Sequence, residues 1–220
     1  MLKTNYNNIL FDLDGTITDS KDGIFKSLRY AFDKLGEEQP EEKFLMSFLG
    51  PPLWDSFTHK LGYDQEKANL AVAYFRERFQ PLGIYENKLY PGIKELLHML
   101  SQRKDVKIYL ATAKPLQSAI KVIEYFKIDK YFTDISGATF DGAIKGKSQV
   151  IGNLLNRIGE IDKNKTIMIG DRDHDVMGAK EHGIVSAGVL YGYGSKEELL
   201  AADYIAKDID DLKNILLQEI

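Results

Sequence analysis

The chain has 220 residues, of which 44% are hydrophobic and 28% charged, values typical of a soluble globular protein with a substantial core. Its formal net charge of -4 gives no overall bias towards nucleic acid, so we expect no nucleic-acid partner. Cysteine is absent, which excludes disulfides and cysteine nucleophiles, and no apolar run reaches the roughly 18 residues of a membrane helix. We therefore expect a cytoplasmic protein with no membrane partner.

Short apolar runs that end in polar or small residues recur along the chain. They predict buried strands at residues 8–11, 106–110, 166–169 and 184–187. Helical patterns accompany the later runs, at residues 93–101, 116–126, 148–158 and 176–182. Strands that alternate with helices of this length predict an α/β fold, in which a parallel sheet is covered by helices on both faces. Ligands bind such sheets beyond the carboxyl ends of the strands, where these polar residues stand.

The segment between the first two strands breaks this alternation. It contains helical patterns at residues 24–35, 54–61 and 67–79, interrupted by the sequence Gly50-Pro51-Pro52. A helical domain inserted into the α/β domain explains this arrangement best. We therefore predict two domains, an α/β core formed by residues 1–17 and 88–220 and a helical domain formed by residues 18–87.

Two carboxylates follow the first predicted strand in the sequence Asp12-Leu13-Asp14-Gly15-Thr16. Residues two apart in an extended chain point the same way, which suits Asp12 and Asp14 to a shared metal or reacting group. Gly15 allows a tight turn after them. Taken alone, the stretch is equally consistent with an ordinary Asp-Gly turn.

A second acidic cluster follows the third predicted strand and opens a helix, in the sequence Gly170-Asp171-Arg172-Asp173-His174-Asp175. Asp171 stands where a carboxylate could complete a hard-cation site with Asp12. Asp175 falls in the first helical turn, where it could bond to a lysine or to backbone. The alternative is N-terminal capping by acidic residues. We expect the lone His174 to face solvent.

The middle of the chain contains residues that could bind an anion. Thr112 ends the second predicted strand and Lys114 is expected to begin the next helix, where a hydroxyl and backbone N–H groups could hold phosphate oxygens. An ordinary helix cap would look much the same. Lys145 and Lys147 flank Gly146 before another helix, and one of them could reach the sheet edge while the other stays solvated.

Four motifs in order now give the chain a resemblance to the haloacid dehalogenase superfamily of phosphatases. The motifs are Asp12-Leu13-Asp14-Gly15-Thr16, Leu110-Ala111-Thr112, a lysine, and Gly170-Asp171-x-x-x-Asp175, which together extend over essentially the whole chain. The similarity is to the subgroup that includes phosphoglycolate phosphatases and small 5′-nucleotidases. It implies a Rossmann-like parallel-sheet core with an inserted α-helical cap domain.

The resemblance also implies catalytic roles. Asp12 looks like the nucleophile that forms an aspartyl-phosphate, and Asp14 like the general acid/base. The cofactor would be Mg²⁺, with Asp12, the backbone carbonyl of Asp14 and Asp171 as ligands. Asp175 would support the site by orienting the lysine or a metal-bound water.

Further residues resemble phosphate- or substrate-binding groups of the family. Thr112 and the amide of Ala113 would hold the transferring phosphoryl group, with Gly15 and Lys114 beside them. Lys147 is favoured as the catalytic lysine by the register Lys-x-x-Val-Ile, although Lys145 stays open. Gly50 and Pro51 look like a specificity loop of the cap, and a simple turn between helices explains them equally well. The sequence Tyr191-Gly192-Tyr193-Gly194 resembles the late loop of this subgroup, with an expected structural role near the sheet edge.

The resemblance implies a Mg²⁺-dependent phosphomonoester hydrolase acting on a small phosphorylated metabolite of the phosphoglycolate or nucleoside 5′-monophosphate type. A pyrophosphatase and a phosphosugar mutase are the alternatives on the same fold. The mutase ranks lower because the helical segment lacks a loop with histidine and arginine–proline of the kind seen in such mutases. A binding protein that has lost catalysis is disfavoured because every polar residue that the chemistry needs is present. The substrate and the choice between monomer and homodimer are left open.

Overall fold

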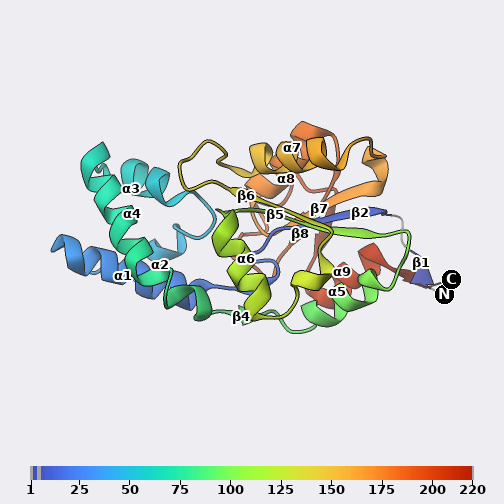
Figure 1. Ribbon diagram of the computed structural model, residues 1–220, viewed down its shortest axis with the longest axis horizontal. Coiled ribbons are helices and arrows are strands. Elements are labelled where there is room, and N and C mark those ends of the chain that lie inside the picture. Colours follow the sequence, from blue (N-terminus) through green and yellow to red (C-terminus); the bar gives the residue numbers. More distant parts are fainter. Residues whose placement is uncertain (1, 4–5, 220) are drawn as a thin grey trace. The chain divides into compact units, whose positions relative to one another are not determined.

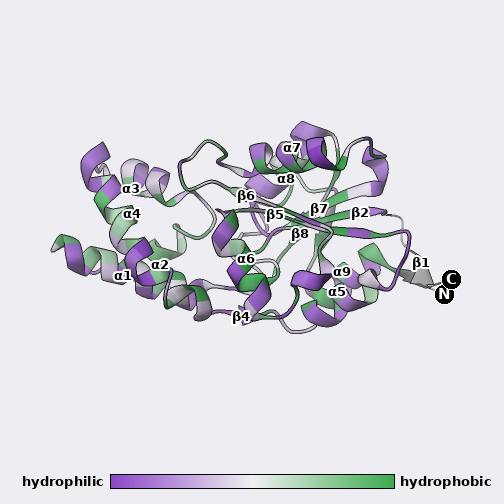
Figure 2. Ribbon diagram, viewed as in Figure 1, coloured by the Kyte–Doolittle hydropathy of each residue, from purple (hydrophilic) through white to green (hydrophobic). Residues whose placement is uncertain are grey.

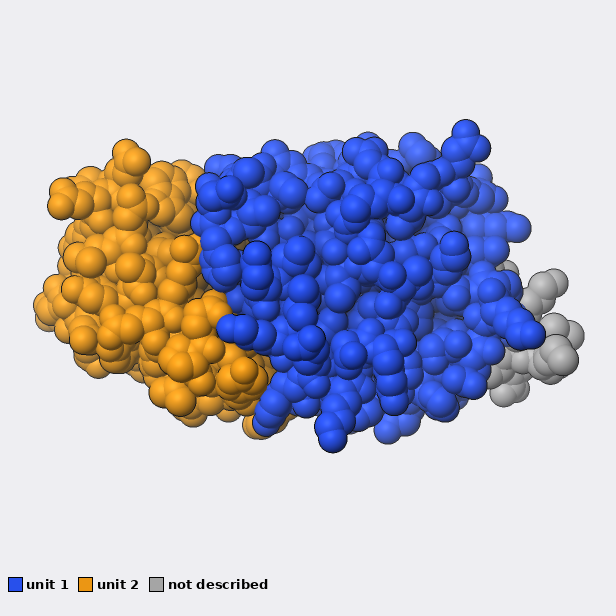
Figure 3. Space-filling model, in the orientation of Figure 1, with its two compact units in different colours: residues 1–18, 89–220 blue, residues 19–88 orange. Residues whose placement is uncertain are grey.

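The computed structural model describes residues 2–3 and 6–219, and the chain divides into two compact units. Unit 1 comprises Met1–Thr18 and Leu89–Ile220, and unit 2 comprises Asp19–Lys88 (Figure 3). These boundaries lie one residue from the domain limits expected from the sequence. The chain passes from one unit to the other within two short strands, β3 (Thr18–Asp19) and β4 (Lys88–Leu89).

Unit 1 is built on a six-stranded sheet with the strand order β6-β5-β2-β7-β8-β9. The strands are β2 (Asn8–Phe11), β5 (Lys107–Pro115), β6 (Asp134–Ala138), β7 (Thr166–Gly170), β8 (Val185–Val189) and β9 (Tyr204–Ala206). Each neighbouring pair is parallel, which confirms the predicted α/β class. A separate antiparallel pair joins β1 (Leu2–Lys3) to β10 (Gln218–Glu219).

Helices cover both faces of this sheet. They are α5 (Ile93–Ser101), α6 (Leu116–Tyr125), α7 (Lys147–Ile158), α8 (Asp173–His182) and α9 (Ile209–Leu216), with short 3-10 turns at η2 (Asp129–Tyr131) and η3 (Lys163–Lys165). Figure 1 shows α7 and α8 on one face and α5, α6 and α9 on the other. Hydrophilic residues of α5 and α7 lie on the side away from the sheet (Figure 2). The apolar sides that remain bury the core, as amphipathic helices do.

Strand β5 differs from its prediction in a way that affects a candidate site residue. The strand continues through Lys114 to Pro115, and α6 begins at Leu116, so the expectation that Lys114 begins the helix is wrong. Proline disfavours helical conformation in the residue before it, which keeps Lys114 extended. The backbone of Pro115 itself, with φ -53° and ψ 132°, is not helical.

Unit 2 is helical, as the pattern of its sequence indicated. It contains α1 (Lys21–Leu35), α2 (Glu42–Met46), α3 (Leu53–Leu61), α4 (Gln65–Phe79) and the 3-10 turn η1 (Gly83–Tyr85). Its centre holds buried aromatic rings, with 5.3 Å between the ring centroids of Phe48 and Phe57. In the part of the chain that the structure describes, no helix is both long enough and apolar enough to span a membrane.

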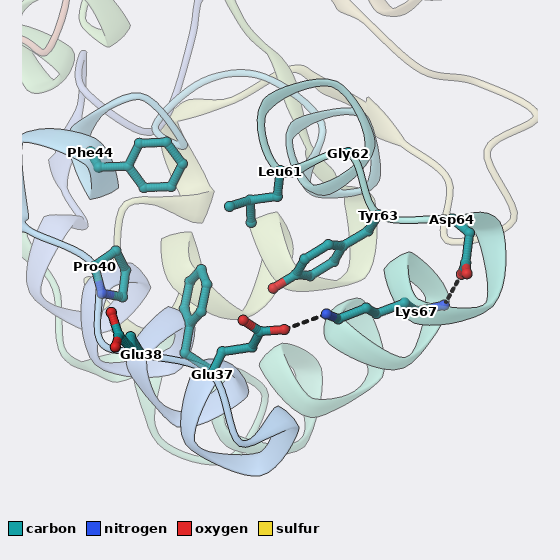
Figure 4. Close-up of a pocket in the computed structure, with 10 residues that line it drawn as sticks. Glu37, Glu38, Pro40, Phe44, Leu61, Gly62, Tyr63, Asp64 and Lys67 are labelled. Carbon is teal, nitrogen blue, oxygen red and sulfur yellow. Dashed lines mark hydrogen bonds and ion pairs between the residues drawn. The ribbon is translucent and has the colours of Figure 1, made fainter.

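A groove of about 570 Å³ opens within unit 2, between aromatic side chains and charged ones (Figure 4). Among the residues that line it, the ammonium group of Lys67 forms an ion pair with Glu37. The same ammonium lies 4.2 Å from the ring centroid of Tyr63, within the range of a cation–π contact. The charge of Lys67 is thus balanced by groups of the groove itself.

Candidate active site

The carboxyl ends of three central strands bring the predicted site residues together. Strand β2 lies between β5 and β7, and Phe11 at its end is in register with Leu110 on one side and Ile169 on the other. The residues that follow these positions therefore emerge at one edge of the sheet, and among them Asp12, Thr112 and Asp171 are at most 5% exposed. Buried polar side chains at such an edge require partners, and the structure supplies them.

Lys147, the first residue of α7, is the lysine that reaches Asp12. Its Nζ lies 2.6 Å from Oδ1 of Asp12 and 2.9 Å from Oδ1 of Asp175, and it donates a hydrogen bond to the carbonyl of Ala111. Burial would lower the pKa of Lys147, but the charges of the two carboxylates outweigh burial and raise it. Lys147 therefore stays protonated. Lys145, by contrast, has an exposed side chain.

Asp175 serves the helix and the lysine at the same time. Its Oδ2 accepts a hydrogen bond from the backbone N–H of Arg172, which caps α8, while its Oδ1 pairs with Lys147. Burial would raise the pKa of Asp175, but Lys147 and the adjacent His174 outweigh burial and lower it. Both roles suggested by the sequence are therefore present: Oδ2 caps the helix and Oδ1 is the partner of the lysine. Close packing requires Gly170, because a Cβ there would lie 2.2 Å from the carboxyl carbon of Asp175.

Asp171 completes a group of three buried carboxylates. One oxygen each from Asp12, Asp171 and Asp175 lies within 4.8 Å of the others. Burial and the charges of Asp175 and Asp12 raise the pKa of Asp171 to about 8. Burial likewise raises the pKa of Asp12, although Lys147 opposes the change.

The charge balance of this group fits a divalent cation. Lys147 contributes one positive charge against three carboxylates, and carboxylate oxygens are the donors that Mg²⁺ prefers. Two of the predicted ligands, Asp12 and Asp171, belong to the group. Asp175, to which the sequence assigned a supporting role, also belongs to it. The side chain of Asp14 is not part of the group, because it pairs with Lys114. Its backbone carbonyl stays the predicted metal ligand.

Asp14 and Lys114 form a second ion pair at the same edge. The ammonium of Lys114 lies 3.0 Å from Oδ1 and 2.8 Å from Oδ2 of Asp14. The Lys114 side chain is 5% exposed and that of Asp14 is 18% exposed. The backbone N–H of Lys114 also donates to the hydroxyl of Thr112. Lys114, a predicted phosphate-binding residue, is therefore ion-paired with Asp14, the predicted general acid/base.

The remaining predicted substrate contacts occupy both units. Gly15 has φ +88°, and a Cβ there would lie 2.2 Å from the Asp171 carboxylate, so the turn needs glycine. Ala113 is half-buried beside Thr112. Gly50 and Pro51 lie in unit 2, in the loop between α2 and α3, and their contact with a substrate stays a prediction.

His174 turns its ring nitrogens away from solvent, contrary to the expectation from the sequence, although 29% of its side chain stays exposed. Its Nδ1 lies 3.5 Å from Oδ1 of Asp175, and both ring nitrogens are enclosed. Burial would lower the pKa of His174, but the carboxylate of Asp175 outweighs burial and raises it. The expectation failed because α8 begins at Asp173, which folds His174 into the first turn, against the site.

Comparisons with known proteins identify the family. Residues 9–189 match the family of haloacid dehalogenase-like hydrolases. The chain is 40% identical to a 5′-nucleotidase of Pseudomonas aeruginosa over 96% of each chain, and 35% identical to the tyrosine-protein kinase PtkA of Mycobacterium tuberculosis over 90% of this chain and 65% of that protein. It is also similar to the crystal structure of a predicted phosphatase from Clostridium acetobutylicum, with a TM-score of 0.88, 41% identity, and coverage of 94% of this chain and 96% of that one. The chain therefore belongs to the haloacid dehalogenase-like hydrolase family, and it is a phosphatase.

Proposed function

We propose that the chain is a Mg²⁺-dependent phosphomonoester hydrolase that acts on a small phosphorylated metabolite through an aspartyl-phosphate on Asp12. The observation that carries the proposal is the buried Asp12 carboxylate, paired at 2.6 Å with Lys147 and grouped with Asp171 at the sheet edge. The similarity to a 5′-nucleotidase favours a nucleoside 5′-monophosphate as the substrate class.

In the first half of the reaction, a carboxylate oxygen of Asp12 attacks phosphorus, and the bond between phosphorus and the leaving oxygen breaks. Asp14, in its protonated form, would give a proton to that oxygen, and in the second half its carboxylate would take a proton from the water that attacks the phosphoryl group on Asp12. Asp14 suits this task because it is the more exposed of the two aspartates, with 18% of its side chain accessible.

Positively charged groups held in place at the site would balance the negative charge of the transferring phosphoryl group. Lys147 is held by two carboxylates and a carbonyl, so its ammonium is already oriented when a phosphate arrives. Thr112 and the amide of Ala113, near the carboxyl end of β5, would hold phosphoryl oxygens. When bound by Asp12, Asp171 and the carbonyl of Asp14, Mg²⁺ would neutralise phosphoryl charge and keep substrate and nucleophile aligned.

A panel of phosphorylated metabolites tests the proposal. Nucleoside 5′-monophosphates, phosphoglycolate, pyrophosphate and hexose phosphates are incubated with the protein, with Mg²⁺ and after exhaustive chelation, and inorganic phosphate is measured. We expect phosphate release from a monophosphate in Mg²⁺ and its loss on chelation. Activity that survives chelation would contradict the metal requirement, and a rearranged hexose phosphate without free phosphate would indicate the mutase.

For Asp14→Asn we expect a loss of turnover by about 10²- to 10⁴-fold, the usual contribution of general acid/base catalysis. Substrate affinity should be largely kept, because Lys114 retains its charge and the Asp14 carboxylate no longer competes with phosphate for it. Steady-state rates together with binding of a non-hydrolysable analogue separate the two effects. Collapse of binding with normal turnover would show that Asp14 is a binding group instead.

A further inference from the structure

Each oxygen of the Asp171 carboxylate accepts a hydrogen bond. The hydroxyl of Thr16 donates to Oδ1 at 3.2 Å, and the backbone N–H of Tyr193 donates to Oδ2 at 2.8 Å. Asp171 is fully buried, so its orientation depends on these contacts. Each carboxylate oxygen can accept more than one bond, so a donor on each oxygen fixes the plane of the group and leaves capacity for a cation.

The second contact comes from the segment Tyr191-Gly192-Tyr193-Gly194, here called the late loop. A Cβ on Gly192 would lie 2.3 Å from both the Asp171 Cβ and the Gly15 carbonyl oxygen, and a Cβ on Gly194 would lie 1.9 Å from the Asp171 carbonyl oxygen. Real Cβ atoms do not approach so closely. The backbone of the late loop therefore encloses Asp171 at a distance that only glycine permits at these two positions.

The late loop is tied back to the segment that carries Thr16. The hydroxyl of Tyr191 donates to the backbone carbonyl of Thr16 at 3.1 Å. The Tyr191 ring also packs edge-on against Tyr90, with 4.9 Å between centroids. Thr16 thus contacts Asp171 through its side chain and the late loop through its backbone. The two hydrogen-bond donors of the Asp171 carboxylate are therefore themselves linked by a hydrogen bond between their segments.

We propose that Thr16 and the late loop are positioning residues that hold the Asp171 carboxylate in the orientation used to bind a divalent cation. The inference rests on the Mg²⁺ site of the proposed function. It assigns a role to the late loop beyond packing, because the loop's amide contacts a predicted metal ligand directly. Groups that orient metal ligands in this way commonly account for about 10- to 100-fold in metal affinity.

The test measures Mg²⁺ binding to the full chain by calorimetry, in the absence of substrate. Thr16→Val removes the hydroxyl and keeps the shape, and we expect about 10- to 100-fold weaker binding. Thr16→Ser retains the hydroxyl and should bind Mg²⁺ nearly as the wild type does. The matched control is Thr18→Val, because Thr18 is equally buried and its hydroxyl donates to the Leu13 carbonyl instead. Thr18→Val should leave Mg²⁺ affinity unchanged.

Two further variants keep the test decisive if Thr16→Val does not fold. Tyr191→Phe removes the tie to the Thr16 backbone, and Gly192→Ala forces the late loop away from Asp171; both should weaken Mg²⁺ binding. Wild-type affinity in Thr16→Val, or an equal loss in Thr16→Ser, would overturn the positioning role. If the loop variants are measured instead, wild-type affinity in both overturns it. A wild-type protein that binds no Mg²⁺ would overturn the metal site itself, which separates the two failures.

Discussion

Asp12→Asn should reduce phosphate release by about 10⁴-fold or more, the scale of loss when a covalent nucleophile is removed. The asparagine amide matches the carboxylate in shape but cannot attack phosphorus or carry the phosphoryl group. Asparagine fills the same volume, so the packing around this residue, which is 5% exposed, is kept, although the ion pair with Lys147 is lost. Initial rates measure the loss, and rapid quenching with labelled substrate should trap a phosphoenzyme in the wild type and none in the variant.

Asp134→Asn is the matched control. Asp134 also stands on a strand of unit 1, but it begins β6 and pairs with Arg157 at the half-exposed surface. Its replacement should leave both turnover and the trapped phosphoenzyme unchanged. Wild-type turnover in Asp12→Asn, or an undiminished phosphoenzyme, would remove Asp12 from the nucleophile role.

Lys147→Met should lower both turnover and stability. The Lys147 side chain is 1% exposed, and removing its charge leaves the Asp12 and Asp175 carboxylates buried and facing each other. Breaking a buried ion pair in this way costs about 3–5 kcal/mol in the free energy of unfolding. Turnover should fall by about 10²- to 10³-fold, as when one preorganised charge-stabilising donor is lost. Urea denaturation and initial rates measure the two effects.

Mg²⁺ should restore part of the stability of Lys147→Met, because a cation among the carboxylates replaces some of the missing charge. Lys145→Met is the control, since Lys145 is exposed, and a surface substitution of this kind changes stability by about 0.5 kcal/mol or less. If Lys145→Met loses activity and Lys147→Met does not, the assignment of the two lysines is reversed.

Much of the α/β core could be predicted from local sequence. Strong apolar runs such as the one ending at Phe11 are long enough to indicate a buried strand. Because parallel strands end at one edge, Asp12 and Asp171 could be placed together before any contact was known. Strand β6 was missed because it includes Asp134 and a glycine, and β9 because it has three residues. The apolar run of β9 is therefore short, and β6 has no continuous apolar run.

The finer arrangement of the site could not be predicted, because it depends on contacts between distant segments. Thr16 and Asp171 are 155 positions apart, and Lys114 and Asp14 are 100 apart. A local pattern carries no signal for such pairs. One error did have a local signal: Pro115 directly follows Lys114, and the conformational restriction before proline indicates an extended residue there.

The central place of β2 in its sheet has a consequence for synthesis and folding. Within its sheet this strand is made before its neighbours, and Asn8 pairs with Lys107 on one side and Thr166 on the other. Contacts between residues so far apart in the chain form slowly, since a long loop must close before they are gained. While the ribosome completes unit 2, β2 has neither neighbour, so both of its backbone edges are unpaired and its apolar side chains are exposed. The segment that carries Asp12 therefore needs protection from aggregation until those partners are made.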